Sequence, residues 1–431
     1  MVLPDRVVNG ALVIQDGVIT QIAPRVDDTV GEEIDARGLT VLPGVIDPHV
    51  HFRDPGYPEK EDLVSGSRAA AAGGVTAFLD MPNTNPATTS VQALHDKLDR
   101  AALRSCVHYG FFIGATPDNL DELNAAERTC GIKIFMGCST GDLLVHDRED
   151  LEAIFANANK LIAVHAEDEA RLRERKLLYA DSTDPADHPK IRDVETALNA
   201  TKLAVDLALK HGRRLHVLHM SSAEEVDLLR TVSHERITAE VCPQHLLMSA
   251  PDCFERLGTR AQCNPPIRAE RHARALWAAL RDGTASCIAT DHAPHTVAQK
   301  DRPYPEAPSG MPGVEWSLPL MLDQVAKGRA TLNDVVRWMC QGPADCYRIP
   351  RKGRLEIGFD GDIVLVDTQQ TRTIENGKVW TRCGWSPYDR WTLTGWPVLT
   401  AVLGRPVYRD GAIIEGVLGR ELTFGGSQFG R

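Results

Sequence analysis

The middle of the chain, roughly residues 45–348, alternates short apolar runs with longer stretches of helical periodicity. Short apolar runs bounded by turn residues are typical of buried strands, whereas apolar positions three or four apart are typical of helices, here over 194–210 and 271–280. Because the units alternate and no G-x-G-x-x-G turn follows the first strand, they favour a TIM-like (β/α)8 barrel over an open doubly wound sheet. The predicted strands are 42–49, 75–80, 107–111, 132–136, 162–165, 215–219, 237–241 and 287–291.

Both ends of the chain show a different pattern, in which apolar runs are shorter and are broken by turns. Residues 11–19 indicate a hairpin around an Asp-Gly turn, and residues 407–414 indicate a second one. Residues 361–367 carry a further strand signal. We therefore expect residues 1–44 and 349–431 to form one small composite β-sandwich domain beside a barrel of residues 45–348.

Composition and charge narrow the function classes. A chain of 431 residues with 43% hydrophobic and 25% charged residues is ordinary for a globular protein with ample core. The net charge of −11 argues against binding to nucleic acid or an anionic membrane. No apolar stretch reaches membrane-spanning length and no signal-peptide pattern begins the chain. The ten cysteines include no C-x-x-C pair, so we expect reduced thiols and a cytoplasmic location.

Polar residues interrupt the apolar strands near their carboxyl ends. Alternate residues of a strand face the same side, so His49 and His51 can reach one metal ion together, and Arg53 keeps the same parity. Taken alone, a His-x-His pair is better explained by strand histidines that hydrogen-bond to neighbouring groups. Further polar side chains lie in or at the ends of other predicted strands: Lys133, His165, His219 and Asp291.

In a βα barrel the carboxyl ends of the strands converge on one mouth, where the active sites of this fold lie. His165 and His219 could instead be hydrogen-bonded core histidines. Asp291 could be a helix N-cap, and Lys133 an ion-paired barrel lysine. Six such residues at one end of five strands favour a shared site. Imidazoles and carboxylates suit Zn²⁺, and a desolvated neutral lysine can take up CO₂ to give a carbamate that bridges two ions.

Motifs distributed along the whole predicted barrel carry a family resemblance. These segments are Asp47–Gly56, Met81–Pro86, Gly131–Gly137, Val164–Glu167, His219–Ser222, Cys263–Arg268 and Thr290–His295. On these motifs the chain closely resembles the dihydroorotases of the amidohydrolase superfamily, which are cyclic amidohydrolases. The resemblance also fits the β-rich chain ends.

The resemblance implies reversible cyclisation of N-carbamoyl-L-aspartate to L-dihydroorotate in de novo pyrimidine (UMP) biosynthesis. It implies two Zn²⁺ ions per subunit, bridged by N6-carboxylated Lys133 and a hydroxide, with Asp291 as general acid and base. Some family members carry aspartate at the lysine position, so this chain resembles the carboxylated, two-metal kind. The implied ligands are His49, His51 and Asp291 for one ion and His165 and His219 for the other.

The resemblance also implies how the substrate is held. The substrate carboxylate is expected to meet Arg53, Asn83 and His295. The pyrimidine ring is expected to meet Asn264 and the backbone of Ser309 and Gly310. No role is assigned to the loop 137–142. We expect a homodimer, with aspartate transcarbamoylase as a possible partner enzyme.

Two other functions stay open at this point. An allantoinase or hydantoinase would open a cyclic amide with the same metals, but it would not need the carboxylate-binding set. A non-catalytic, dihydroorotase-like partner of aspartate transcarbamoylase would not need the ligands. Some site residues also have structural alternatives: a salt bridge from Arg53 to Asp54 or Glu61, and a turn role for Asn83. We expect His292 to support the site, and we expect structural or solvent-facing roles for His108, His188, His211 and His245.

Overall fold

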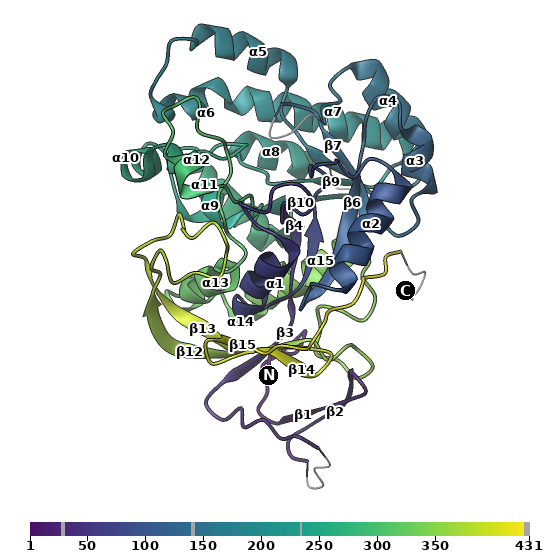
Figure 1. Cartoon of the computed structure of the whole chain (residues 1–431), viewed down its shortest axis with the longest axis vertical. Coiled ribbons are helices and arrows are strands. Elements are labelled where there is room, and N and C mark those ends of the chain that lie inside the picture. The colour runs from purple at the N-terminus through teal and green to yellow at the C-terminus, as the bar shows by residue number, and fades with distance from the viewer. Residues whose placement is uncertain (27–30, 139–142, 233–234, 426–431) are drawn as a thin grey trace.

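Eight parallel strands form the centre of the molecule (Figure 1). The computed structural model describes residues 1–26, 31–138, 143–232 and 235–425. Each strand is hydrogen-bonded to the next one along the chain. The strands are β4 (Val45–Val50), β5 (Val75–Asp80), β6 (His108–Gly114), β7 (Gly131–Phe135), β8 (Ile162–His165), β9 (Leu215–Val217), β10 (Ile237–Val241) and β11 (Cys287–Ile288).

The sheet closes into a barrel at the mouth. Val50, the last residue of β4, forms a parallel bridge with His292, and the His51 amide donates to the His292 carbonyl over 2.8 Å. The predicted barrel is therefore confirmed. Strands β9 and β11 end earlier than predicted, because side-chain carboxylates replace the strand-to-strand backbone hydrogen bonds at their carboxyl ends. The His219 amide donates to the Glu240 carboxylate over 3.1 Å, and the Thr290 amide donates to the Asp47 carboxylate, also over 3.1 Å.

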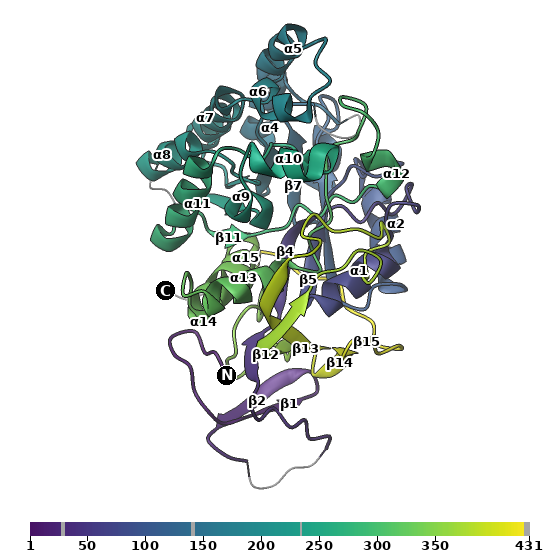
Figure 2. The same ribbon diagram turned by 90° about the vertical axis from the view of Figure 1, so that its left-hand side faces the viewer.

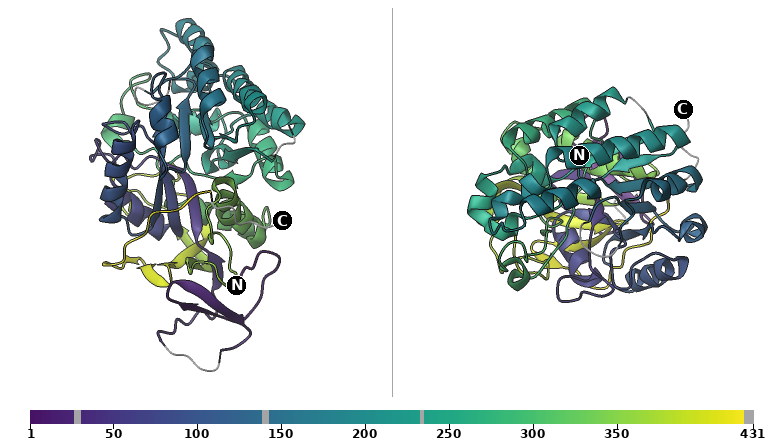
Figure 3. Two further views of the ribbon diagram at one scale, coloured as in Figure 1. Left: turned by 90° about the vertical axis from the view of Figure 1, so that its right-hand side faces the viewer. Right: turned by 90° about the horizontal axis from the view of Figure 1, so that it is seen from above.

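Helices cover the outside of the barrel, as the view from above shows (Figure 3). Both predicted helices are confirmed: α7 begins after the Asp193 cap and ends at His211, before Gly212 with φ of +63°, and α11 lies where expected. The α-helices are α1 (Leu63–Ala72), α2 (Val91–Ala102), α3 (Leu120–Ala125), α4 (Arg148–Asn157), α5 (Glu169–Leu178), α6 (His188–Ile191), α7 (Val194–His211), α8 (Ala223–Thr231), α9 (Pro243–Leu247), α10 (Asp252–Leu257), α11 (Glu270–Asp282), α12 (Val297–Lys300), α13 (Ser317–Ala326), α14 (Leu332–Val336) and α15 (Gly342–Tyr347). The 3-10 helices η1 (Pro185–Asp187) and η2 (Gly258–Ala261) and the π-helix η3 (Arg337–Gln341) complete the set.

The two ends of the chain share an antiparallel sheet beneath the barrel (Figure 2). Its order is β15-β14-β13-β12-β3, so a strand from the N-terminal end pairs with one from the C-terminal end. The composite β-structure predicted from sequence is thus present. The N-terminal hairpin forms its own two-stranded sheet. The strands are β1 (Ala11–Gln15), β2 (Val18–Ala23), β3 (Thr40–Pro43), β12 (Ile363–Thr373), β13 (Thr392–Val402), β14 (Arg405–Arg409) and β15 (Ala412–Ile413).

The main hydrophobic core continues from the barrel into this sheet, and Val364 and Val402 belong to the same buried cluster as Phe78 and Ile134. The loop after β12 runs back along the barrel, where the Trp385 indole N–H donates to the His295 carbonyl over 2.8 Å. The C-terminal segment therefore supports the barrel mouth directly. Among the described residues, no helix combines the length and apolar character needed to cross a bilayer.

Candidate metal centre

The barrel brings the six predicted metal-site residues to one buried cavity. His49 lies near the end of β4 and His165 ends β8, while His219 and Asp291 follow β9 and β11 by two or three residues. The cavity measures about 20 Å³, which is room for ions or single waters. Its lining includes His49, His51, Lys133, His165, His219 and Asp291, together with Asn264, Ser309 and Gly310 from the predicted substrate set.

Two groups of donor atoms meet inside this cavity. Asp291 Oδ1 lies 3.0 Å from His51 Nε2 and 3.3 Å from His49 Nε2, so these three side chains could share one ion. His165 Nδ1 lies 2.9 Å from His219 Nε2. The His49 and His219 rings are 5.3 Å apart between centroids, so the two groups are neighbours. Converging imidazole and carboxylate donors of this kind are typical of a zinc site.

The Lys133 amine lies beside these donors with no hydrogen-bond partner among the described residues. It is fully buried, 4.4 Å from the centroid of the Phe135 ring. Burial lowers the pKa of Lys133 to about 7, although the charges of Asp291 and Glu240 oppose the shift. A large part of the amine is therefore neutral near pH 7, which is the form that can react with CO₂.

Acceptors behind the histidines decide which ring nitrogen faces the cavity. His49 Nδ1 lies 2.6 Å from the Glu240 carboxylate, and His51 Nδ1 lies 2.7 Å from the side-chain oxygen of Asn83. With Nδ1 protonated and donating, Nε2 keeps its lone pair for the cavity. His165 is reversed, because its Nε2 lies 2.8 Å from the Glu167 carboxylate and its Nδ1 faces His219.

Glu240 and Glu167 are functional candidates that the sequence reasoning missed. Burial opposes the ionisation of Glu240, but His49 and His216 outweigh it and lower the pKa of this carboxyl to about 2. Burial also opposes the ionisation of Glu167, but the ion pair with Arg192 and the contact with His165 outweigh it and lower the pKa of this carboxyl to about 2. One signal was available, since an acidic residue inside an apolar strand needs a buried partner.

Arg53 and Asn83 lie next to His51, although neither lines the cavity: Asn83 contacts His51 Nδ1, and the charge of Arg53 adds to the burial that lowers the pKa of His51. Arg53 is 3% exposed, and its Nε and Nη2 atoms meet no hydrogen-bond partner among the described residues. Among the described residues Arg53 forms no salt bridge to Asp54 or Glu61. Asp54 pairs with Arg104 at 2.9 Å, and Glu61 accepts from the Thr381 hydroxyl. Burial lowers the pKa of Arg53 to about 10, which leaves the guanidinium charged at neutral pH.

His295 and Asn264 are two further predicted substrate residues. His295 Nε2 lies 3.0 Å from the Ser309 carbonyl, and its buried Nδ1 has no partner in the described part of the chain. Asn264 lies 2.9 Å from His188 Nε2, so the expectation that His188 is only structural or solvent-facing overlooked a contact to a predicted substrate residue. His292 supports the barrel closure as expected, with Nδ1 accepting from the Gly313 amide over 3.0 Å.

Three residues at this site have a left-handed backbone that side chains other than glycine seldom adopt. The φ angles are +61° at Arg53, +37° at His219 and +50° at Asp291. Such conformations cost energy and persist only where surrounding contacts hold them, which is common at functional sites.

Comparisons with known proteins agree with this geometry. A model of the amidohydrolase family matches residues 40–407. The dihydroorotase of Methanosarcina acetivorans is 37% identical over 88% of this chain and 84% of its own length. The dihydroorotase of Halobacterium salinarum is 36% identical over 97% of this chain and 99% of its own length. Among solved structures, the L-hydantoinase (dihydropyrimidinase) of Arthrobacter aurescens superposes with a TM-score of 0.92 at 31% identity, covering 96% of this chain and 95% of that one.

The barrel, the composite sheet and the convergent histidines are those of a metal-dependent hydrolase, and the chain belongs to the amidohydrolase family. Within that family it groups with the dihydroorotases, which it matches over most of its length.

Proposed function

We propose that this protein is a dihydroorotase, which cyclises N-carbamoyl-L-aspartate to L-dihydroorotate reversibly for pyrimidine biosynthesis. The observation that carries this proposal is the buried guanidinium of Arg53, which lies near His51 and whose Nε and Nη2 have no hydrogen-bond partner among the described residues. A buried charge without a partner is costly, so a carboxylate ligand is its natural complement. Dihydroorotate carries such a carboxylate, whereas hydantoin and allantoin do not.

We propose zinc as the metal, held as two ions by the two donor groups. His49, His51 and Asp291 would hold one ion, and His165 and His219 the other. Carboxylated Lys133 would bridge them, and its orphaned, partly neutral amine supports this assignment. Such ions, when bound, would supply Lewis-acid activation of the ring amide and of water.

Asp291 would move the proton of the reaction. Burial opposes its ionisation, but His49 and His51 outweigh burial and keep the pKa of this carboxyl below its usual value. In ring opening the carboxylate would accept a proton and pass it to the leaving ring nitrogen. In ring closure it must begin protonated. Ring opening should therefore gain with rising pH and ring closure with falling pH, and parallel profiles would contradict a shared proton carrier.

The substrate would be held by its carboxylate and by its ring. Arg53 offers a planar fork with two unpartnered nitrogens, while His295 and Asn83 lie beside the same edge of the site. Asn83 has a second role, because its side-chain oxygen already orients His51. Asn264 and the backbone of Ser309 and Gly310 would meet the ring.

Turnover of dihydroorotate, hydantoin and allantoin by one preparation tests the proposal, with metal content measured on the same sample. We expect strong preference for dihydroorotate and about two zinc ions per chain. A preference for hydantoin would instead favour the function named for the Arthrobacter aurescens structure. No turnover by metal-loaded protein would favour a non-catalytic partner of aspartate transcarbamoylase.

The assembly is a separate proposal. We propose a homodimer, and light scattering during gel filtration tests it by giving the molar mass directly. Adding aspartate transcarbamoylase in the same experiment tests the partner, because a complex would elute at a larger mass than either protein.

A further inference from the structure

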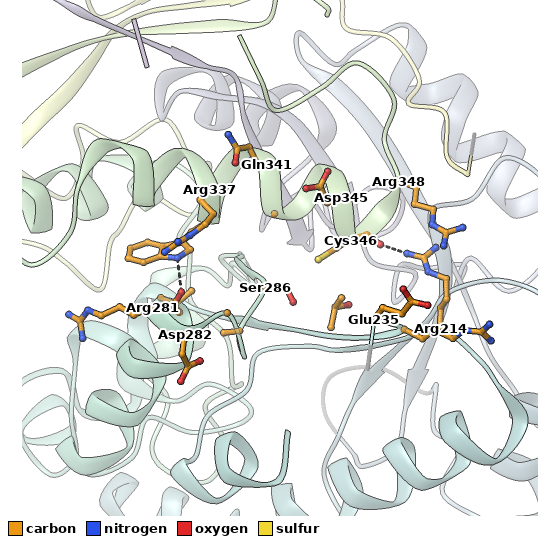
Figure 4. Close-up of a pocket in the computed structure, with 17 residues that line it drawn as sticks. Arg214, Glu235, Arg281, Asp282, Ser286, Arg337, Gln341, Asp345, Cys346 and Arg348 are labelled. Atoms are coloured by element: carbon orange, nitrogen blue, oxygen red, sulfur yellow. Dashed lines mark hydrogen bonds between the residues drawn. The ribbon is translucent and has the colours of Figure 1, made fainter. Parts of the chain in front are cut away.

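A second cavity lies at the opposite end of the barrel from the histidines. Arg214 precedes β9, Thr238 lies in β10 and Ser286 precedes β11, so the cavity opens at the amino ends of these strands. Helices α11, η3 and α15 supply its other wall (Figure 4). Its volume of about 590 Å³ lies within the range of sites for small molecules. The proposed function does not use it.

Arginines dominate the charge of this cavity. Its acidic residues include Asp282 and Asp345, and each already pairs at 2.7 Å with an arginine that does not line the cavity, namely Arg230 and Arg354. Glu235 is the remaining acid. Arg337 likewise pairs at 2.8 Å with Asp334, which does not line the cavity, but the other lining arginines still outnumber Glu235 and leave a surplus of positive charge. The arginines that line it are Arg214, Arg236, Arg281, Arg337 and Arg348.

Two of these arginines lie together at one edge, as Figure 4 shows. Arg214 Nη2 donates to the Cys346 carbonyl. Arg348 is exposed, and among the described residues its side chain forms no hydrogen bond or ion pair. Burial lowers the pKa of Arg214, and the nearby charge of Arg348 adds to the effect. Two like charges held side by side repel, and an anion between them would relieve the repulsion.

We propose that this cavity binds a phosphate monoester, with the phosphate between Arg214 and Arg348 and the rest of the molecule in the remaining space. Guanidinium forks match phosphate oxygens in charge and geometry, and a dianion balances two of them. Ser286 and Gln341, which are labelled in Figure 4, offer neutral hydrogen-bonding groups to a polar body.

Protein side chains separate this site from the metal centre. Thr238 lines the cavity and its hydroxyl lies 2.7 Å from His216 Nδ1. His216 Nε2 in turn lies 3.1 Å from Glu240, which holds His49. A ligand in the cavity therefore cannot touch the catalytic residues, and its binding can be measured independently of turnover.

Calorimetric titration of the metal-loaded protein with inorganic phosphate and with ribose 5-phosphate tests the proposal. We expect one saturable site, tighter binding of ribose 5-phosphate, and weaker binding as salt is raised. Arg214→Met and Arg348→Met should each weaken binding about tenfold or more. Arg348→Met removes no side-chain hydrogen bond or ion pair among the described residues, so it stays informative if Arg214→Met misfolds. Arg274→Met, on the exposed face of α11, is the matched control and should bind normally.

Three results would overturn the proposal: no saturable binding of either probe, affinity in both cavity variants unchanged from that of the parent protein, or binding lost in Arg53→Met and kept in Arg348→Met. The last result would place the anion in the catalytic site. None of these outcomes bears on the dihydroorotase activity, which is measured separately.

Discussion

The buried histidines show why residue type alone does not define a metal ligand. A neutral imidazole presents its lone pair on one nitrogen only, and the partner of the other nitrogen decides which. Here Glu240, Asn83 and Glu167 take one nitrogen from His49, His51 and His165, respectively. The residues that hydrogen-bond to the histidines therefore determine metal binding as much as the histidines do.

Replacing Glu240 by glutamine should weaken metal binding. Glutamine can accept from His49 Nδ1, but without the negative charge that makes His49 a stronger ligand. We expect about a 10–100-fold loss of metal affinity, measured by competition with a chelator. Glu270→Gln, on the exposed surface of α11, is the control. Unchanged metal release from Glu240→Gln would show that Glu240 only fills space.

Arg53→Lys should impair the reaction although charge is kept. An ammonium cannot reproduce the planar fork, so the carboxylate and the attached ring would be held less well. We expect a fall of about a hundredfold in kcat/KM for dihydroorotate. Hydantoin, which lacks the carboxylate, serves as the internal control and should lose little. An equal loss on both substrates would mean that Arg53 shapes the site rather than binds the carboxylate.

At the scale of elements, the strands deliver the side chains and the segments after them set their direction. β9 and β11 stop before His219 and Asp291, and both residues then adopt left-handed backbone. Apolar periodicity predicts where a strand lies. It does not show that a buried carboxylate accepts the hydrogen bond of an amide at the strand end, in place of the neighbouring strand. The predicted strands 215–219 and 287–291 were therefore too long.

Gly310→Ala should damage the site through the loop that carries it. Gly310 has φ of +131°, and an added Cβ would lie 2.5 Å from the Ala293 carbonyl oxygen and 3.1 Å from the His295 ring. The loop must shift away from His295, so we expect kcat/KM to fall about tenfold or more, measured by steady-state kinetics. Gly328→Ala is a matched control, because that glycine also has positive φ but has nothing within 4 Å of the added Cβ. Equal kinetics of the two variants would contradict this account.

At the scale of the whole molecule, hydrogen bonds to two buried glutamate side chains hold the C-terminal segment against the barrel. Glu315 accepts from the Trp380 amide over 2.8 Å, and Glu61 accepts from the Thr381 hydroxyl. The same segment carries Trp385, which reaches the His295 carbonyl. Hydrogen bonds from this segment therefore link the composite β-structure to the barrel mouth.

Stability should depend on the protonation of Glu315. Burial raises the pKa of Glu315 from 4.5 to about 8. Its contribution to the free energy of unfolding is therefore complete below pH 4.5 and is lost as pH rises through 8, by up to about 1.4 kcal/mol per pH unit. Glu315→Gln keeps the acceptor and removes the titration. We expect the Tm of the variant to gain on that of the parent protein between pH 5 and pH 9, measured by calorimetry, and a constant difference would contradict the shift.

Much of this protein follows from sequence alone, because the signals are local. Apolar runs and turn residues predicted the barrel strands, and the Asp-Gly turns predicted both terminal hairpins, which are present as β1–β2 and β14–β15. Residue type and position at strand ends also group the histidines, Lys133 and Asp291 into one predicted site. Each of these inferences needs only the neighbouring residues and the common geometry of parallel strands.

Tertiary structure alone decided which nitrogen of each histidine faces the cavity, that Arg53 lacks a partner among the described residues, and that arginines gather at the far end of the barrel. His49 and Glu240 are 191 residues apart, and Arg214 meets the Cys346 carbonyl across 132 residues. Such contacts depend on how complete strands and helices pack, so no local pattern specifies them. Hydrogen bonds and charge balance act over a few ångströms in space, whatever the separation along the chain.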